Sequence, residues 1–168
     1  RVPQMLRVDG MERHTTGQFL STRGATLSAQ PTQALAKTDE VFAPAPGSLA
    51  GRTVLITGAN SGLGLESAAR LAAAGADVVA TARTDAKAQQ AVNEIEKRTG
   101  RKVSGVALDL ADLKSVKSLP SRLPKSVSKI DVLMENAGVM AIPERLATKD
   151  GFERQIGVNH LGHYALVA

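Results

Sequence analysis

The chain has 168 residues, with 21 Lys and Arg against 16 Asp and Glu, a formal net charge of +5, and neither Cys nor Trp. The absence of Cys excludes disulfide scaffolds, thiolate metal sites and cysteine nucleophiles. No apolar run approaches the roughly 18 residues that a membrane-spanning helix needs, and the 43% hydrophobic and 22% charged residues are typical of a soluble globular protein.

The first 48 residues differ in composition from the rest of the chain. Between Arg13 and Lys37 there is no acidic residue, while Ser and Thr are frequent, as in organellar transit peptides and in disordered polar leaders. The prolines and glycine of residues 43–47 would end any helix. We expect residues 1–48 to be a disordered or transit-like leader and residues 49–168 one folded domain. The favoured location is intracellular and cytoplasmic, with plastid or mitochondrion as the alternative if the leader is a transit segment.

Short apolar runs alternate with longer amphipathic ones from residue 49 onward. The β-branched run 53–57 is typical of a strand buried on both faces, and the apolar spacing after Gly64 predicts a helix that ends at Gly75. Further on, the patterns predict strands at 77–82, 103–108 and 130–134, and helices at 85–99 (capped by Asp85), 112–123 and about 159–168. Such alternation predicts a doubly wound α/β fold with a parallel sheet.

Ligands of doubly wound sheets bind beyond the carboxyl ends of the strands. The first strand is followed by TGANSGLG, residues 57–64, whose glycines allow a tight turn and close approach to a pyrophosphate at the start of a helix. Glycines also serve ordinary turns, and the spacing differs from G-x-G-x-x-G, so the interpretation depends on the position between a buried strand and a helix. This segment is a candidate phosphate-binding loop.

Three further strand ends have residues suited to the same ligand. Arg83 follows the second strand about 20 residues after the glycines, where an Arg accommodates the 2′-phosphate of NADP and a carboxylate would favour NAD; its alternative is a solvated surface Arg. Asp109 follows the third strand and is either an adenine contact or a turn residue. Asn136, Ala137 and Gly138 follow the fourth strand and are small enough for the chain to pass close to a flat ligand.

These motifs, together with VNHLGH at 158–163, resemble the short-chain dehydrogenase/reductase family from about Leu49 to Ala168. The resemblance implies a Rossmann fold and hydride transfer between NADP(H) and a small-molecule carbonyl or alcohol substrate. It implies that Asn159 belongs to the catalytic Asn-Ser-Tyr-Lys tetrad and holds a water in the proton relay. The implied cofactor-binding residues are Gly58, Asn60, Ser61, Gly62, Leu63, Gly64, Arg83, Asp109, Leu110, Asn136, Ala137 and Gly138.

The stretch TKDGFERQIGVNHLGHY, residues 148–164, further resembles the branch that includes retinol dehydrogenases, WW-domain oxidoreductases and protochlorophyllide reductase-like proteins. This resemblance favours a lipid-like substrate. Two features depart from the family pattern: Glu135 stands where a second Asn is usual, and Tyr164 has Ala168, not Lys, four residues later. We therefore expect the catalytic Ser and Tyr-x-x-x-Lys to lie beyond Ala168, the sheet to be about half built, and this chain alone to be inactive.

Other functions receive less support from the sequence. A non-catalytic nucleotide-binding module stays open as the alternative to an enzyme. His160 and His163 lie three residues apart, but no carboxylate or Cys completes a metal site beside them, and we expect no metal. The basic stretch 114–129 has no interleaved aromatic residue for base stacking, so we expect no nucleic-acid partner. By family resemblance the full-length protein is expected to be a homo-oligomer, and from the lack of a long apolar run we expect no transmembrane segment.

Overall fold

The computed structural model describes residues 44–168, in which four parallel strands form one sheet. The strands are β1 (Thr53–Ile56), β2 (Asp77–Ala82), β3 (Ser104–Ala107) and β4 (Val132–Met134), in the spatial order β3-β2-β1-β4. Every pair is parallel, with Leu55 of β1 opposite Val79 of β2 and Leu133 of β4. The doubly wound α/β sheet expected from the sequence is confirmed. Because β2 and β4 flank β1, the strand order changes direction there, which is where such sheets bind ligands.

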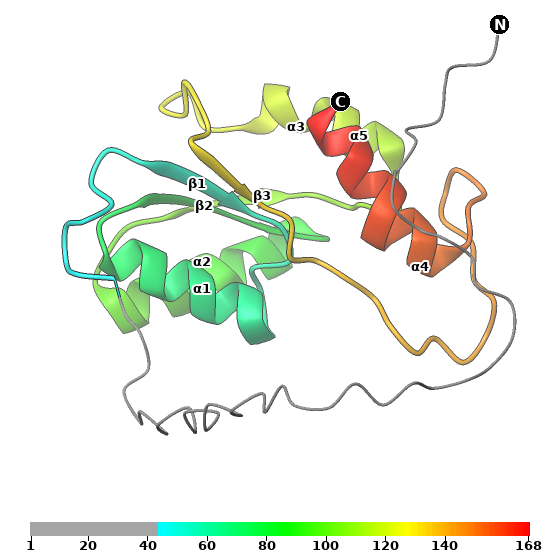
Figure 1. The fold of residues 1–168 in the computed structure, drawn as a ribbon, viewed down its shortest axis with the longest axis horizontal. Helices are drawn as coiled ribbons and strands as arrows, with labels where there is room; N and C mark the ends of the chain where they lie inside the picture. The colour runs from blue at the N-terminus through cyan, green and yellow to red at the C-terminus, as the bar shows by residue number, and fades with distance from the viewer. Residues whose placement is uncertain (1–43) are drawn as a thin grey trace, which may run out of the picture. The chain divides into compact units, whose positions relative to one another are not determined.

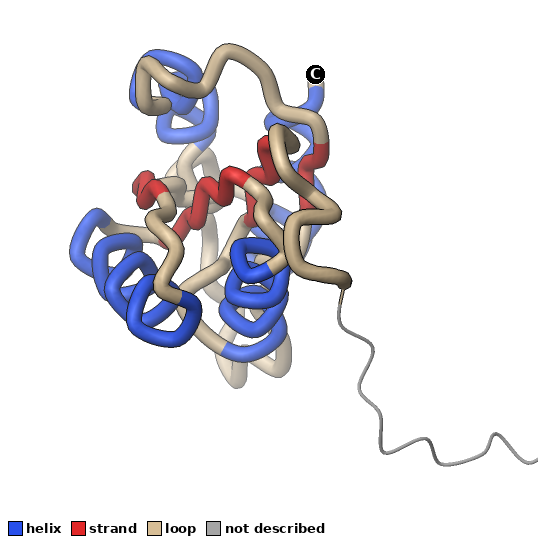
Figure 2. Tube along the Cα trace, turned by 90° about the vertical axis from the view of Figure 1, so that its left-hand side faces the viewer, coloured by secondary structure: helices blue, strands red, loops and turns tan. Residues whose placement is uncertain are grey.

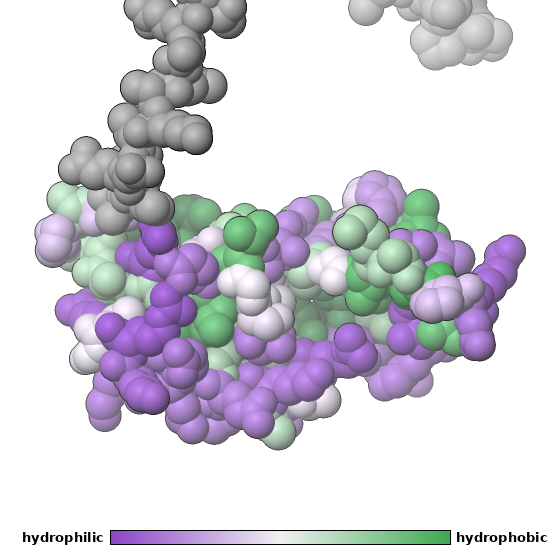
Figure 3. Space-filling view, turned by 90° about the horizontal axis from the view of Figure 1, so that it is seen from below, coloured by the Kyte–Doolittle hydropathy of each residue, from purple (hydrophilic) through white to green (hydrophobic). Residues whose placement is uncertain are grey.

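Helices cover both faces of this sheet (Figures 1 and 2). On one face lie α1 (Gly62–Ala73) and α2 (Asp85–Thr99), whose outer surface is largely hydrophilic (Figure 3). On the other face α3 (Leu113–Arg122) lies beside a continuous helical segment at the end of the chain. That segment consists of α4 (Arg154–Ile156), the π-helix η1 (Gly157–Gly162) and α5 (His163–Val167).

The core consists of two layers, because successive side chains of a strand point to opposite faces of the sheet. Val54 and Ile56 of β1 pack in the layer that includes Ala68, Ala72, Ala91 and Ile95 of α1 and α2. Leu55, between them in sequence, packs in the other layer with Val116 and Leu119 of α3 and Val158 of η1. The alanines let α1 approach the strands closely, and the two layers together hold the carboxyl ends of the strands in place.

Element bounds differ from the expected ones at several positions. The helix 85–99 is capped by Thr84, not by Asp85: Thr84 has extended dihedral angles and its hydroxyl accepts the Lys87 N–H at 3.3 Å. Asp85 is instead the acidic residue of the first turn. The last helical segment begins at Arg154, five residues before the expected start, and includes the π-helix that the apolar pattern did not indicate. The first, third and fourth strands are each shorter than expected.

The expectations for the N-terminal leader fall mostly on residues 1–43, which lie outside the described part of the chain. Within residues 44–168, Pro46 to Gly51 form turns before β1. No helix in this described range is long and apolar enough to cross a membrane.

Candidate functional site

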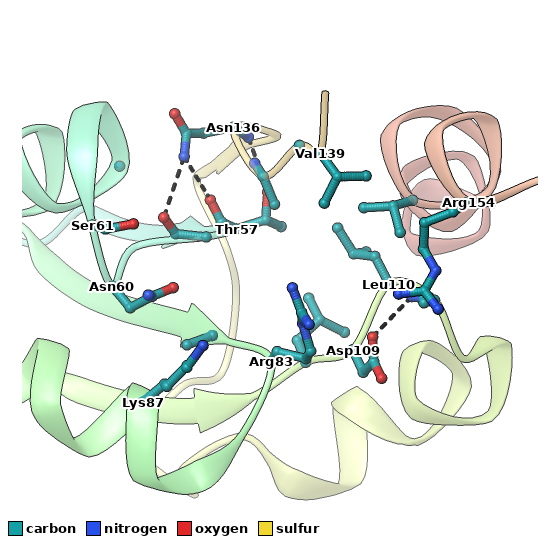
Figure 4. Close-up of a pocket in the computed structure, with 18 of the residues that line it drawn as sticks. Thr57, Asn60, Ser61, Arg83, Lys87, Asp109, Leu110, Asn136, Val139 and Arg154 are labelled. Atoms are coloured by element: carbon teal, nitrogen blue, oxygen red, sulfur yellow. Dashed lines mark hydrogen bonds between the residues drawn. The ribbon is translucent and has the colours of Figure 1, made fainter. Parts of the chain in front are cut away.

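A pocket of about 720 Å³ lies at the carboxyl ends of the strands (Figure 4). Its lining comes from the loops after all four strands and from residues 147–158. Eleven of the residues singled out from the sequence line it: Gly58, Asn60, Ser61, Leu63, Gly64, Arg83, Asp109, Leu110, Asn136, Ala137 and Gly138. Gly62 and Asn159 are not part of this lining. The structure therefore brings segments up to about 100 residues apart in the chain to one place, as in nucleotide-binding sheets of this type.

The loop between β1 and α1 leaves the start of the helix open toward the pocket. Gly58 and Gly62 have φ values of +67° and +55°, a region that favours glycine. Ser61 is the N-cap of the twelve-residue helix α1, and its side chain makes no capping hydrogen bond. A Cβ at Gly58 would lie 2.9 Å from Ala137, so the loops after β1 and β4 are in close contact. Free amides at a helix start next to such a tight loop are suited to binding a phosphate.

Thr57 joins the loops after β1 and β4. Its Oγ1 accepts the N–H groups of Asn136 and Ala137, both at 2.9 Å. In return the Asn136 side-chain Nδ2 donates to the Thr57 carbonyl at 3.0 Å (Figure 4). Thr57 is 1% exposed. The sequence analysis included Thr57 in the candidate loop 57–64 but gave its side chain no role, because the partners of that side chain lie about 80 residues away in the chain.

Basic side chains predominate among the charged residues of the pocket. Arg83 and Lys87 are exposed and come from the end of β2 and the first turn of α2, and Lys149 and Arg154 come from the far wall. Asp109 is the one acidic residue in this lining. Sequence reasoning missed Lys87, although its position four residues after Arg83, at the start of an expected helix, was a usable signal. The pocket is thus electrostatically suited to an anion.

Asp109 forms the turn that follows β3. Its Oδ1 accepts the Ala111 N–H at 3.0 Å, and its own N–H donates to the Ser115 hydroxyl at 3.0 Å. The interpretation of Asp109 as a turn residue is therefore correct, and the same carboxylate also faces the pocket. Asp112 is the N-cap of α3, and its side chain accepts the N–H groups of Lys114 and Ser115.

The far wall of the pocket is a short hairpin, residues 147–153, in which Ala147 and Glu153 form an antiparallel bridge. The Asp150 carboxylate accepts the Leu113 N–H at 2.9 Å, and the Lys149 ammonium pairs with Asp112 at 2.7 Å. This pairing raises the pKa of Lys149 above 10.5 and lowers the pKa of Asp112 below 3.8. We name this segment the 147–153 hairpin. The tip of this hairpin is held against the first turn of α3. The hairpin therefore has a fixed position in the pocket wall, although its sequence shows no periodic pattern.

Asn159 lies outside the pocket lining and holds the loop that follows β4. Its Oδ1 accepts the Val139 N–H, and its Nδ2 donates to the Val139 carbonyl, both at 2.8 Å. The Asn159 main-chain oxygen lies 3.1 Å from Nδ1 of His163. Its assignment to a catalytic proton relay stays a prediction.

The residues that departed from the family pattern are exposed. Glu135 is exposed, so its carboxylate does not need the hydrogen-bonding or basic partner that a buried carboxylate would require. Tyr164 is 64% exposed.

The two histidines considered as metal ligands differ in burial: His160 is exposed and His163 is buried. Among residues 44–168 there is no group of three or more side chains that could hold a metal ion.

Comparison with known proteins gives the class of this fold and site. The model of the short chain dehydrogenase family matches residues 52–168. Human retinol dehydrogenase 13 is 40% identical over 124 residues, covering 73% of this chain and 37% of that protein. Human retinol dehydrogenase 14 is 42% identical over 135 residues, covering 72% of this chain and 40% of that protein. The chain thus belongs to the short-chain dehydrogenase/reductase family and spans less than half the length of these curated relatives.

Solved structures agree with this assignment. An uncharacterized protein from Mycobacterium paratuberculosis is 47% identical with a TM-score of 0.61, covering 70% of this chain and 41% of that chain. A metagenomic short-chain oxidoreductase in complex with NADP is 30% identical with a TM-score of 0.59, covering 71% of this chain and 54% of that chain. The resemblance to the family and to its retinol dehydrogenase branch, stated from the sequence motifs, is confirmed.

Proposed function

We propose that the protein is an NADP(H)-dependent oxidoreductase that acts on a carbonyl or alcohol group of an apolar small molecule. The observation that favours NADP(H) is the pair of cations, Arg83 and Lys87, at the pocket edge beyond β2. A carboxylate at this place favours NAD, whereas an Arg accommodates the 2′-phosphate. The NADP in the solved metagenomic relative is in keeping with this choice.

The described residues fit such a cofactor. The start of α1 and the glycine loop, with Ser61 and Leu63, would hold the pyrophosphate, because the N-cap Ser61 makes no capping hydrogen bond and leaves the first amides of the helix free. Asp109 and Leu110 would bind the adenine, and Asn136 to Gly138 would line the nicotinamide half. The cofactor supplies hydride transfer, and the protein supplies orientation and electrostatics. Asn159 would keep the far end of this loop in position through Val139.

We propose a lipid-like substrate because two of the relatives are named retinol dehydrogenases. Proton transfer would require a Tyr other than Tyr164. This residue is the one Tyr in the sequence, its side chain is 64% exposed, and Ala168 stands four residues later where the family has Lys. The exposure of Tyr164 and the Ala at position 168 also favour a second candidate function, nucleotide binding without catalysis.

Arg83→Ala tests the cofactor assignment. Because hydrogen bonds to charged groups contribute about 1.5–3 kcal/mol, NADPH should bind roughly 10- to 100-fold more weakly to this variant, while NADH binding changes little. The measurement is the dissociation constant of each dinucleotide from the fluorescence of the reduced nicotinamide. Lys97→Ala is the matched control, since Lys97 is an exposed cation on α2 outside the pocket lining. Equal losses for NADPH and NADH in the Arg83 variant would contradict the 2′-phosphate assignment.

The two candidate functions differ in turnover. If the chain binds NADPH without catalysis, the purified 168-residue chain should bind NADPH and yet fail to oxidise it in the presence of retinal, as followed by the nicotinamide absorbance. NADPH oxidation that depends on retinal would show that the chain contains its own proton donor, and would exclude the non-catalytic candidate.

A further inference from the structure

His163 is a buried polar residue that the proposed function does not use. It lies at the start of α5 with 5% of its surface exposed. Its Nε2 is 2.9 Å from Oγ1 of Thr57, a residue 106 positions earlier, and its Nδ1 is 3.1 Å from the main-chain oxygen of Asn159. The imidazole therefore touches two residues that each hold the loop after β4.

The partners of His163 determine which ring nitrogen carries the proton. A carbonyl oxygen only accepts, so Nδ1, which faces the Asn159 carbonyl, must donate. Thr57 Oγ1 has two lone pairs, and both are used by the N–H groups of Asn136 and Ala137. The hydroxyl can then only donate, and the unprotonated Nε2 is the acceptor within 2.9 Å.

The hydroxyl has one alternative acceptor. The Met134 carbonyl is 3.5 Å from Oγ1, and it already accepts the N–H groups of Thr57 and Asn136 at 3.0 and 3.1 Å. The shorter and less crowded contact is the one to His163. A neutral imidazole with its proton on Nδ1 thus satisfies every donor and acceptor in this buried cluster, as buried polar groups require.

Residues 136–139 are held by two sets of hydrogen bonds. In the first clamp, Thr57 Oγ1 binds the main-chain N–H groups of Asn136 and Ala137. In the second clamp, the Asn159 side chain binds the main-chain N–H and carbonyl of Val139. His163 bonds to one residue of each clamp. Residues 136–139 all line the pocket, so the clamps determine the shape of its nicotinamide side.

We propose that His163 is a positioning residue of the cofactor site, which keeps the Thr57 hydroxyl oriented so that both of its lone pairs face the loop after β4. The inference rests on the proposed function, because it assumes that this loop binds NADP(H). Without an acceptor at Nε2, the hydroxyl would turn toward Met134, and its lone pairs would turn away from Asn136 and Ala137. The loop would then loosen even though His163 itself touches no ligand.

Two substitutions separate hydrogen bonding from packing. In His163→Leu the side chain keeps its apolar bulk but offers Thr57 no acceptor, whereas in His163→Gln the Oε1 atom can reach the place of Nε2 and accept. Since one net hydrogen bond corresponds to roughly a threefold to tenfold change in an equilibrium constant, we expect His163→Leu to weaken NADPH binding by about tenfold. His163→Gln should stay within about threefold of the wild type. His160→Leu, the same change at an exposed position of the same helical segment, is the control.

A double-mutant cycle tests whether His163 acts through Thr57. Thr57→Val removes the hydroxyl, so adding His163→Leu to it should weaken NADPH binding no further. Each dissociation constant is measured under conditions in which urea unfolding curves show that the variant is folded. Additive losses, or equal losses in the Leu and Gln variants, would indicate a packing role and overturn the inference.

The imidazole itself provides a test that needs neither cofactor nor variant. The ¹⁵N spectrum of His163 in the wild-type protein should show a protonated Nδ1 and an unprotonated Nε2, and the opposite tautomer would overturn the inference. Failure of the wild type to bind NADPH would contradict the proposed function, whatever the spectrum shows. Wild-type binding that is unchanged in His163→Leu would overturn the inference on His163 alone.

Discussion

A Cβ at Gly64 would lie 2.5 Å from Nδ2 of Asn136, so the first turn of α1 meets the loop after β4 with no room for a side chain. The same Cβ would also clash with the Gly58 carbonyl oxygen. Gly64 is helical, and its backbone does not itself require glycine; the requirement comes from this close approach. The approach brings the helix start and the loop after β4 to the same side of the pocket.

Gly64→Ala should therefore lower both stability and NADPH affinity. Overpacking of this kind typically costs about 1–3 kcal/mol, which the urea midpoint would report. Gly138→Ala is the control for stability, because its Cβ would first meet Asn159 Oδ1 at 3.5 Å, an ordinary contact. If Gly64→Ala were as stable as Gly138→Ala, the two loops would have to be further apart than they are in this structure.

The cap of α2 provides a second prediction. Thr84→Ala should destabilise the protein by about 1 kcal/mol, because it removes the acceptor of the Lys87 N–H. Asp85→Ala should cost less, since a carboxylate in the first turn adds only about 0.3–1 kcal/mol through the helix dipole. Thermal or urea unfolding of the two variants compares them directly. If Asp85→Ala destabilised the protein more than Thr84→Ala, Asp85 would be the N-cap.

The sequence predicted the alternation of strands and helices because the physical signals are local. The centres of the runs 53–57 and 77–82, residues 54–56 and 78–80, are continuously apolar where the strand is buried on both faces, and helical spacing follows each run. Parallel pairing then follows from the crossover connections. The predicted N-cap of α2, Asp85, was wrong by one residue because Thr and Asp are both good N-caps. The choice between them depends on backbone dihedral angles that composition does not reveal.

The pocket was predictable at the strand ends and not at its far wall. Gly58, Arg83, Asp109 and Asn136 each directly or closely follow a strand, and the topology alone brings strand ends together. The 147–153 hairpin has no periodic pattern, and contacts with the start of α3 fix its position. The bond between Thr57 and His163 joins residues 106 positions apart. Such a pairing depends on side-chain geometry in the folded state.

Acid should destabilise the fold as the pH falls below about 4. The Lys129 ammonium and then the Thr53 N–H hold the pKa of Asp131 below its ordinary value of 3.8, and Lys149 does the same for the pKa of Asp112. A folded-state pKa below that of the unfolded chain means that the unfolded chain binds protons first. This stabilisation is present above pH 3.8 and is lost as the pH falls through the lower folded-state values.

The measurement is the urea midpoint at pH 7 and at pH 3, in the wild type and in Asp131→Asn. The amide oxygen of Asn can still accept the Thr53 N–H, so the variant loses mainly the charge. We expect it to be less stable than the wild type at pH 7 and to lose less stability on acidification. An equal loss in both proteins would mean that Asp131 does not contribute to the acid response.

Asp150→Ala should free the wall of the pocket from α3. The Asp150 carboxylate accepts the N–H of Leu113, the first residue of α3, so its removal leaves that amide without this acceptor. Hydrogen exchange at Leu113 should become faster, and NADPH should bind more weakly because Lys149 of the hairpin and Arg154, which follows it, would no longer be held at the pocket. Asp150→Asn, which keeps an acceptor oxygen, should behave like the wild type in both measurements. Unchanged exchange at Leu113 in Asp150→Ala would show that the Lys149 pair with Asp112, at 2.7 Å, suffices to hold the 147–153 hairpin.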